Sequence, residues 1–252
     1  MRHPGLIVLA TLGVATCCRP ADAWGEGRIS VGAMLWRHET NLKVERATDY
    51  DGSNITSGER LRDWDVSGSG LGARINYELP RLVTIYGEAG TSQATVSDKD
   101  VTDPSQQVES RGLNGGAYFA VGATIGDYFS GTGNLFWRVG GSVASISAGL
   151  DRDVNRSWDY DETRISGDLK IGTWVQQVGF YGGLRMVQSN ADLRETDRTN
   201  LPGEQSRVTE LARDSAVDLL VGAQTRGPEI SGFTEIGMIG TFSATAGLTL
   251  RF

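Results

Sequence analysis

The stretch Phe242-Ser-Ala-Thr-Ala-Gly-Leu-Thr-Leu-Arg-Phe252 alternates apolar and polar side chains over its whole length. The even-numbered positions hold Phe, Ala, Ala, Leu, Leu and Phe, and the odd-numbered positions between them hold Ser, Thr, Gly, Thr and Arg. Strict alternation of this kind is typical of a β-strand whose two faces meet different surroundings. A barrel strand that crosses a membrane meets lipid on one face and the lumen on the other. The stretch therefore predicts such a strand.

The same period of two recurs along the chain upstream of this stretch. It predicts ten strands, at about 28–37, 71–79, 83–89, 113–125, 135–143, 165–175, 180–186, 217–223, 230–238 and 242–252. Eight or twelve strands remain open, because strand boundaries are the least certain part of such a prediction. The fold class that follows is all-β, an antiparallel up-and-down transmembrane β-barrel.

The connections between the predicted strands alternate in length. Those near 80, 126–133, 176–179 and 226–228 are short, whereas 38–62, 92–111, 147–162 and 188–213 are long and polar. Outer-membrane barrels have short periplasmic turns and longer outer loops, so this alternation favours a membrane barrel over a soluble periplasmic β-sandwich. The last hairpin does not fit, because almost no loop separates its strands near Ile239-Gly240.

The first 23 residues read as a signal peptide. Arg2 and His3 precede an apolar run from Leu6 to Thr16, and Ala21-Asp22-Ala23 supplies the small-x-small cleavage pattern. We therefore expect two segments, a signal peptide at 1–23 and the barrel at 24–252. An uncleaved anchor or a lipoprotein acylated at Cys17 or Cys18 are the alternatives.

The charge and composition narrow the function classes. The chain carries 24 basic and 31 acidic residues, a net charge of −7, and a mean hydropathy of −0.25. An acidic chain without basic clusters is a poor partner for nucleic acid, so no nucleic-acid binding is expected. The 34 glycines lie inside apolar alternations, as at Gly68, Gly70 and Gly72, where strand glycines mark bends or crowded backbone.

This pattern resembles small bacterial outer-membrane β-barrel proteins, without pointing to a subfamily. The resemblance rests on the Ala21-Asp22-Ala23 site, the ten alternations and the final strand. It implies that Phe242, Leu248, Leu250 and Phe252 form the signal read by the barrel-assembly machinery. It also implies location in the outer membrane of a Gram-negative envelope, in contact with its lipids and lipopolysaccharide; the oligomeric state stays open.

The face opposite the apolar one should fill the lumen. Its charged members form the expected lumen charge network: Arg74, Glu88, Arg138, Asp168, Lys170, Arg185, Asp218, Glu235 and Arg251. Unlike charges in a low-dielectric interior must pair and hydrogen-bond, and ten strands leave little more room than side chains fill. We therefore expect a lumen largely plugged by ion pairs, in a barrel with a structural or surface-interaction role. A narrow porin-like channel for small solutes is the alternative.

No convincing catalytic constellation emerges, so the chain is not expected to be an enzyme. His38 is the single histidine downstream of the signal peptide, and Asp63 or Asp65 could orient it in a rim-site hydrolase, but no serine is placed distinctively beside them. No cofactor or metal is expected either. Asp49-Tyr-Asp-Gly-Ser-Asn54 has oxygen ligands close together, but its glycine comes too early for a calcium loop. Solvated loops are the preferred interpretation of such aspartate-rich segments, and weak cation binding stays open.

Overall fold

The computed structural model is built from β-strands. It describes residues 28–48, 54–55, 64–79, 83–98, 110–129, 134–153, 156–197, 205–225, 227 and 229–252, and the expected signal peptide lies outside them. The strands are β1 (Arg28–Thr48), β2 (Asn54–Ile55), β3 (Trp64–Leu79), β4 (Val83–Asp98), β5 (Ser110–Tyr128), β6 (Leu135–Asp153), β7 (Arg156–Val175), β8 (Val178–Asp197), β9 (Gln205–Thr225), β10 (Ile230–Met238) and β11 (Phe242–Arg251). Within the described ranges no helix is long and apolar enough to span a membrane.

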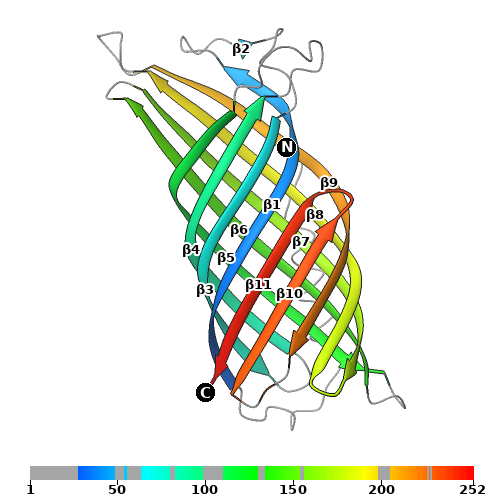
Figure 1. Cartoon of the computed structure of the whole chain (residues 1–252). Coiled ribbons are helices and arrows are strands. Elements are labelled where there is room, and N and C mark those ends of the chain that lie inside the picture. Colours follow the sequence, from blue (N-terminus) through cyan, green and yellow to red (C-terminus); the bar gives the residue numbers. More distant parts are fainter. Residues whose placement is uncertain are drawn as a thin grey trace.

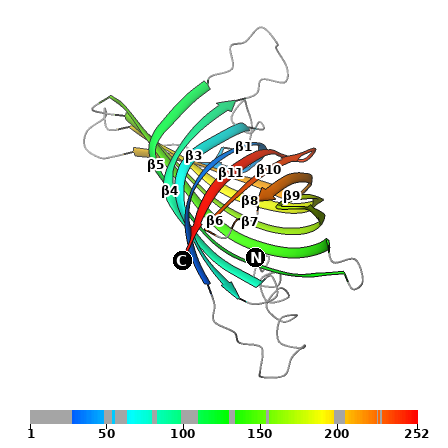
Figure 2. The same cartoon turned by 60° about the horizontal axis from the view of Figure 1, so that its bottom comes forward.

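Ten of these strands form a closed antiparallel ring. Each strand from β3 to β11 pairs with the next in sequence order, β1 pairs with β3, and β11 returns to β1 over ten residue pairs, from Ser30 with Arg251 to Glu39 with Phe242. The two-residue β2 only extends the end of β1. Figure 2 shows the strands curving around a common axis with β11 beside β1. The predicted up-and-down barrel of ten strands is therefore confirmed.

The two ends of the barrel differ in their connections. At the turn end, which also carries Phe252, the strands are joined through 80–82, 129–134, 176–177 and 226–229. At the opposite end, the loop end, the connections are 49–63, 99–109, 154–155 and 198–204. The short turns match the prediction. The long loops predicted over 38–62, 92–111, 147–162 and 188–213 are wrong in extent, because strand structure covers much of each.

The β10–β11 hairpin is much shorter than the strands beside it, as Figure 1 shows. Beyond its tip, β1 pairs directly with β9, from Lys43 with Ala212 to Thr48 with Val208. The ring thus narrows from ten strands to eight towards the loop end. We call the parts of β1 and β3–β9 beyond the hairpin tip the extension. This narrowing accounts for the hairpin without an outer loop, because its tip fills the junction where β1 and β9 converge.

Two charged residues of β9 hold this hairpin tip in place. Arg213 donates to Thr40 Oγ1 at 2.6 Å and to the carbonyl of Gly240. Asp218, which is fully buried, accepts from the backbone N–H of Thr241 at 2.6 Å and from its hydroxyl. The backbone groups of a tight turn need such partners where no strand pairs with them.

Replacing Ile239 at this tip by glycine is expected to raise the free energy of unfolding by about 1 kcal/mol. Ile239 has φ 104°, a conformation that strains a β-branched residue by about 1–3 kcal/mol, and glycine adopts it freely at some entropic cost. The side chain is 77% exposed, so little packing is lost. Urea unfolding in lipid vesicles measures the change. The control Met238→Gly, in the adjoining strand without positive φ, should destabilise; equal losses in both variants would contradict the role of strain.

A belt of exposed apolar side chains surrounds the ten-stranded part. Leu35 is 59% exposed, and Val121 and Leu248 are both 64% exposed. The belt also includes Ile29, Val31, Leu71, Ile75, Ile85, Phe119, Leu169, Ile171, Phe180, Leu184, Met186, Val217, Leu219, Val221, Ile230, Ile236 and Leu250. An apolar surface that encircles a barrel suits acyl chains and is unfavourable in water.

Inside the extension the bore is filled by an apolar core. Leu42, Val66, Leu113, Tyr160 and Leu211 are each no more than 2% exposed. Ala94, Val96, Ala148, Trp158, Ala191 and Leu193 complete the cluster. Most of these residues continue the lumen-facing alternation of their strands, and register shifts in β5 and β9 bring Leu113 and Leu211 to the same face. They therefore pack across the bore. This core was not predicted from the sequence, because most of its residues lie in segments predicted as loops.

Candidate functional site

The lumen of the ten-stranded part is the candidate site, because there alternate residues point inward and many are charged. The predicted lumen charge network falls on eight strands: β3, β4, β6, β7, β8, β9, β10 and β11. A charge costs about 2–4 kcal/mol when it faces lipid at the midplane, which keeps these side chains on the inner face. All nine predicted members lie in described strands, and the printed contacts divide them into separate groups.

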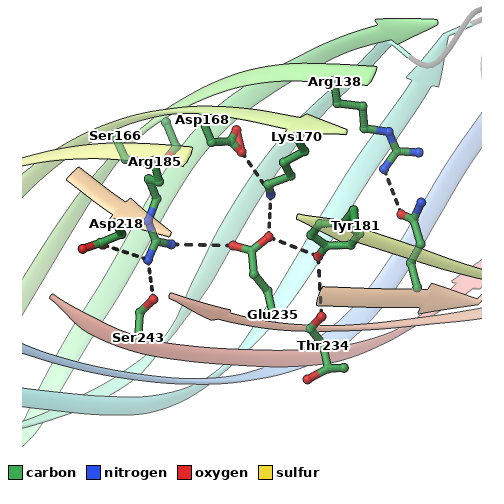
Figure 3. Close-up of polar contacts among 12 residues, drawn as sticks. Arg138, Ser166, Asp168, Lys170, Tyr181, Arg185, Asp218, Thr234, Glu235 and Ser243 are labelled. Carbon is green, nitrogen blue, oxygen red and sulfur yellow. Dashed lines mark hydrogen bonds and ion pairs between the residues drawn. The ribbon is translucent and has the colours of Figure 1, made fainter. Parts of the chain in front are cut away.

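The largest group links the consecutive strands β7, β8, β9 and β10 on the inner wall (Figure 3). Lys170 Nζ lies 3.0 Å from Asp168 Oδ2 and 2.5 Å from Glu235 Oε2. Arg185 lies 3.6 Å from Glu235 Oε1 and 3.3 Å from Asp218 Oδ2. Tyr181 donates its hydroxyl to Glu235 at 3.1 Å. The carboxylates thus alternate with the cations, and each buried charge gains partners that offset its desolvation.

A second group lies on β3, β4 and β5. Arg74 Nη1 is 3.2 Å from Glu88 Oε1, and its Nε donates to Asn76 at 2.7 Å. Tyr118 donates its hydroxyl to Glu88 Oε2 at 2.5 Å. The Arg74 guanidinium also lies over the Tyr86 ring, 3.9 Å from its centroid, where the face of the ring attracts a cation.

The two remaining predicted residues lie apart from these groups. Arg138 on β6 donates to the side-chain oxygen of Gln224 on β9 at 2.9 Å. Arg251 on β11 lies 3.1 Å from Glu78 on β3, near the turn end. The structure therefore brings the predicted lumen residues into several local clusters around the wall, and it adds Glu78 and Gln224 as partners that the prediction did not name as charged members.

Glycines on neighbouring strands make room for these clusters. A Cβ at Gly122 would collide with the Tyr86 ring, one at Gly222 with the Tyr181 ring, and one at Gly172 with the Phe136 ring. Each ring lies opposite its glycine in the strand register. The rings therefore lie flat on the wall. This pairing accounts for three of the glycines that the sequence showed inside alternating strands.

A cation covers each of these three rings on its lumen side. Arg74 lies over Tyr86 at 3.9 Å, Lys170 over Tyr181 at 5.4 Å and Arg138 over Phe136 at 5.3 Å. The wall thus repeats one arrangement of glycine, ring and cation. We call the three copies the Arg74, Lys170 and Arg138 layers. Glu88 and Glu235 pair with the first two cations, and Gln224 occupies the equivalent place beside Arg138.

His38 lies inside the bore, where the charged lumen meets the apolar core. It is 3% exposed and stacks on Trp36, with ring centroids 5.4 Å apart. Its Nε2 is 3.5 Å from Glu162 Oε2 on β7. Glu162, only 1% exposed, also accepts from Tyr160 at 3.0 Å and pairs with Arg164 at 2.8 Å.

Asp65, one of the two aspartates considered as a possible orienting partner of His38, is therefore not its partner. Asp65 alternates with the inward-facing Val66 and Gly68, and it accepts a hydrogen bond from Asn41 at 3.0 Å. Asp63 lies outside the described residues. The true carboxylate partner is Glu162, which is far away in sequence, and no local spacing could have pointed to it.

A cavity of about 430 Å³ occupies the lumen below the apolar core. Its lining runs from Trp36 and His38 to Glu78 and Arg251 at the turn end, and includes the three cations of the layers. None of the apolar core residues lines it. The cavity therefore lies within the ten-stranded part and reaches towards the turn end.

The predicted assembly residues all lie on the outer face or at the end of the last strand. Phe242 is 39% exposed, Leu248 64%, Leu250 51% and Phe252 79%. The backbone N–H of Phe252 donates to the carbonyl of Ile29 at 3.0 Å, which continues the β11–β1 seam. Among the described residues, no three histidine, cysteine, aspartate or glutamate side chains are grouped in a way that could hold a metal ion.

Outside the belt, the outer face of the extension carries a row of acidic residues. Asp161 on β7 lies opposite Asp192 on β8, which lies opposite Glu210 on β9. Partial burial and the charges of Asp159 and Asp192 raise the pKa of Asp161 above its ordinary value. Like charges directly opposite each other destabilise a sheet, so this row weakens the extension at neutral pH.

The variant Asp192→Asn is expected to stabilise the barrel by roughly 0.2–1 kcal/mol at neutral pH. A carboxyl group whose pKa is raised by folding contributes stability below its ordinary pKa, and that stability is lost as the pH rises through the folded pKa. The gain from Asp192→Asn should therefore shrink when urea unfolding is repeated at about pH 4 instead of about pH 7. A gain that is equal at both pH values would show that repulsion is not its cause.

Comparisons with known proteins concern the strand arrangement alone. No protein-family model matches this sequence, and no curated protein does. Similar solved structures include the outer membrane protease OmpT from Escherichia coli, with 13% identity over 90% of this chain and 96% of that one and a TM-score of 0.46. The outer membrane protein OprG from Pseudomonas aeruginosa shows 12% identity, coverage of 91% and 97%, and a TM-score of 0.45. The translocator domain of the autotransporter NalP from Neisseria meningitidis shows 14% identity, coverage of 92% and 90%, and a TM-score of 0.43. With its apolar belt, polar lumen and closed ring, this chain has the fold of a small outer-membrane β-barrel protein.

Proposed function

We propose that this chain is a non-enzymatic outer-membrane barrel with a bore closed to solutes and a structural or surface-interaction role. One observation carries the proposal: the apolar core fills the bore of the extension with side chains such as Leu42, Tyr160 and Leu211, each at most 2% exposed. Ions cross a dry apolar constriction poorly, because nothing there replaces their hydration. The seal is thus chiefly apolar and lies beyond the ion pairs that the sequence suggested as the plug.

The ion pairs narrow the lumen below this seal. Arg185 and Lys170 both contact Glu235, so the charged group covers the inner wall from β7 to β10. A continuous water path would have to pass these groups and then the apolar core. This arrangement supports a closed barrel over the narrow porin-like channel.

Planar-bilayer recording tests the proposal. The wild-type barrel should give no steady single-channel steps, whereas a variant with both Trp158→Ala and Tyr160→Ala should conduct more often, because two large side chains of the core are removed. A gel shift on boiling shows that both proteins insert as folded barrels. Steady steps from the wild type would overturn the closed bore and favour the channel.

The rim-site hydrolase has less support. His38 is 3% exposed and lies beneath the apolar core, so a substrate at the outer rim has no route to it through the described structure. Its position next to Glu162 and Trp36 suits a structural pair at the boundary of core and lumen. His38→Ala is expected to leave any hydrolysis by the purified barrel unchanged, and loss of such activity would revive this alternative.

The orientation of the barrel in the outer membrane is also part of the proposal. Removal of residues 1–23 would leave a barrel with its turn end in the periplasm and its extension outside, among lipopolysaccharide. The belt supports lipid contact, and the exposed apolar face of β11 is suited to recognition by the barrel-assembly machinery. Deleting Phe252 and measuring membrane insertion tests the last point.

A further inference from the structure

One carboxylate oxygen at the boundary between the apolar core and the cavity has two neighbours. Glu162 Oε2 accepts a hydrogen bond from the Tyr160 hydroxyl at 3.0 Å, and His38 Nε2 lies 3.5 Å from the same oxygen. The other oxygen of Glu162 pairs with Arg164 at 2.8 Å. Tyr160 belongs to the apolar core that fills the bore. The oxygen that holds this part of the core is therefore also within reach of an imidazole.

The imidazole of His38 is enclosed without a hydrogen bond from the described part of the chain. Its Nδ1 and Nε2 are both buried, and neither has a hydrogen-bond partner there. A buried donor without an acceptor costs about 1–3 kcal/mol, and more when the group is charged. An imidazolium has two N–H donors, whereas the neutral ring has one. The closed structure therefore suits a neutral His38 better than a charged one.

The charges around His38 favour the same neutral form. On the outer face of β1, Arg37 and Glu39 are exposed, so this level lies beyond the belt. The titratable and charged groups that face the imidazole are Glu162, Arg164 and Tyr160 on β7, Arg185 on β8 and, behind Trp36, Tyr118 on β5. Burial and the charge of Arg164 lower the pKa of His38 below its ordinary value, and Glu162 offsets this only in part. His38 is therefore neutral at about pH 7.

We propose that His38 is a pH switch on the seal: its protonation moves Glu162 Oε2 from Tyr160 to His38 and opens the apolar core to water. The inference rests on the closed bore proposed above and adds its regulation. A charged donor pairs with a carboxylate more strongly than a neutral hydroxyl does, because it adds Coulomb attraction to the hydrogen bond. Tyr160 then loses the acceptor that holds its hydroxyl within the core.

The cavity gives the proton a route from one side only. Its lining joins His38 to Glu78 and Arg251 at the turn end, whereas the apolar core closes the loop end. A hydrated imidazole binds a proton more tightly than a buried one, so acid shifts the equilibrium towards the open state. A single group can change the ratio of open to closed barrels by at most about tenfold per pH unit.

Planar-bilayer recording on single inserted barrels of the full chain tests the switch. Both chambers start at about pH 7, and each is then brought in turn to about pH 5. We expect no steady steps at the start, and acid in one chamber alone should raise the open fraction by about tenfold or more. No response from either chamber, or an equal response from both, would overturn the switch and leave the closed bore standing. Steady steps at about pH 7 would overturn the closed bore itself, and the switch with it.

Three variants assign the response to His38. His38→Phe keeps a flat ring beside Trp36 but binds no proton, so it should stay closed in acid. Asp192→Asn removes an exposed carboxylate from the outer face of the extension and should respond like the wild type. Tyr160→Phe lacks the hydroxyl that competes for Oε2, so it should open more often at neutral pH and gain less from acid. This variant keeps the test decisive if His38→Phe does not fold, as judged by the gel shift on boiling.

The outcomes that contradict the switch are distinct for each variant. A wild-type acid response in His38→Phe would assign the effect to another group. Loss of the response in Asp192→Asn would assign it to the acidic row of the outer face. A full response in Tyr160→Phe would show that the shared oxygen of Glu162 does not couple the imidazole to the seal. Each of these three results would overturn the proposal.

Discussion

Replacing Asp218 by alanine is expected to lower the free energy of unfolding by about 3–5 kcal/mol, the usual cost of breaking a buried charge pair from one side. Asp218 is 0% exposed and serves two structures at once. One oxygen accepts from the Thr241 N–H at 2.6 Å, and the other lies 3.3 Å from Arg185. The variant therefore removes one partner of the hairpin tip, which keeps Arg213, and one partner of the lumen cation Arg185, which keeps Glu235. Urea unfolding of the barrel in lipid vesicles measures the loss.

The isosteric variant Asp218→Asn separates these two effects. Its side-chain oxygen can still accept from Thr241, but the charge that Arg185 needs is gone, so we expect a loss smaller than that of alanine. Asp192→Asn, on the exposed face of the neighbouring strand, is the matched control and should not destabilise. A loss below about 1 kcal/mol for Asp218→Ala would contradict the view that this carboxylate holds the hairpin.

The part of the fold that faces lipid was predictable because its signal is local. In β7, Ile165, Leu169 and Ile171 all occupy odd-numbered positions, so the period of two is visible without any knowledge of the partner strands. The same holds for the final strand. Ten such segments, joined by short turns at one end, are sufficient to predict an antiparallel up-and-down ring.

The extension was missed because its alternation is inverted. In β7 the apolar residues change parity from Trp158 and Tyr160 to Ile165 and Leu169, although the strand continues without a turn. The same inversion occurs in β1 between Leu35 and Leu42. Within the belt the apolar residues face outward, whereas in the extension they face the core. Each strand was predicted to end where its outward-facing apolar alternation ends. The strand in fact continues there, and the inversion marks the end of lipid contact.

The inward direction of the lumen charges was predictable, but their partners were not. The alternation of side chains along each strand places Arg138 and Glu235 on the inner face. The contacts of Arg138 with Gln224 and of His38 with Glu162 depend instead on the closed ring and on strand register. Arg138 and Gln224 are 86 residues apart, so local spacing in the sequence carries no information about such pairs.

The apolar core should respond to the loss of Tyr160 as a folded protein interior does. Tyr160→Ala is expected to lower the free energy of unfolding by about 3–5 kcal/mol, because a side chain that is only 1% exposed is removed from a packed site. Urea unfolding in vesicles measures this loss as well. Because the residue lies outside the belt, lipid cannot fill the vacated space.

Comparing Tyr160→Phe with Tyr160→Ala separates the contribution of packing to stability from that of hydrogen bonding. Tyr160→Phe keeps the ring and removes only the donor to Glu162, a bond of 3.0 Å to a carboxylate, so about 1.5–3 kcal/mol should be lost. The additional loss of unfolding free energy from phenylalanine to alanine then measures the packing of the ring in the core alone. If Tyr160→Ala were no less stable than Tyr160→Phe, the ring would contribute no packing. The apolar core could then not be the tight seal on which the closed bore depends, because a constriction that tolerates an empty aromatic site would already admit water in the wild type.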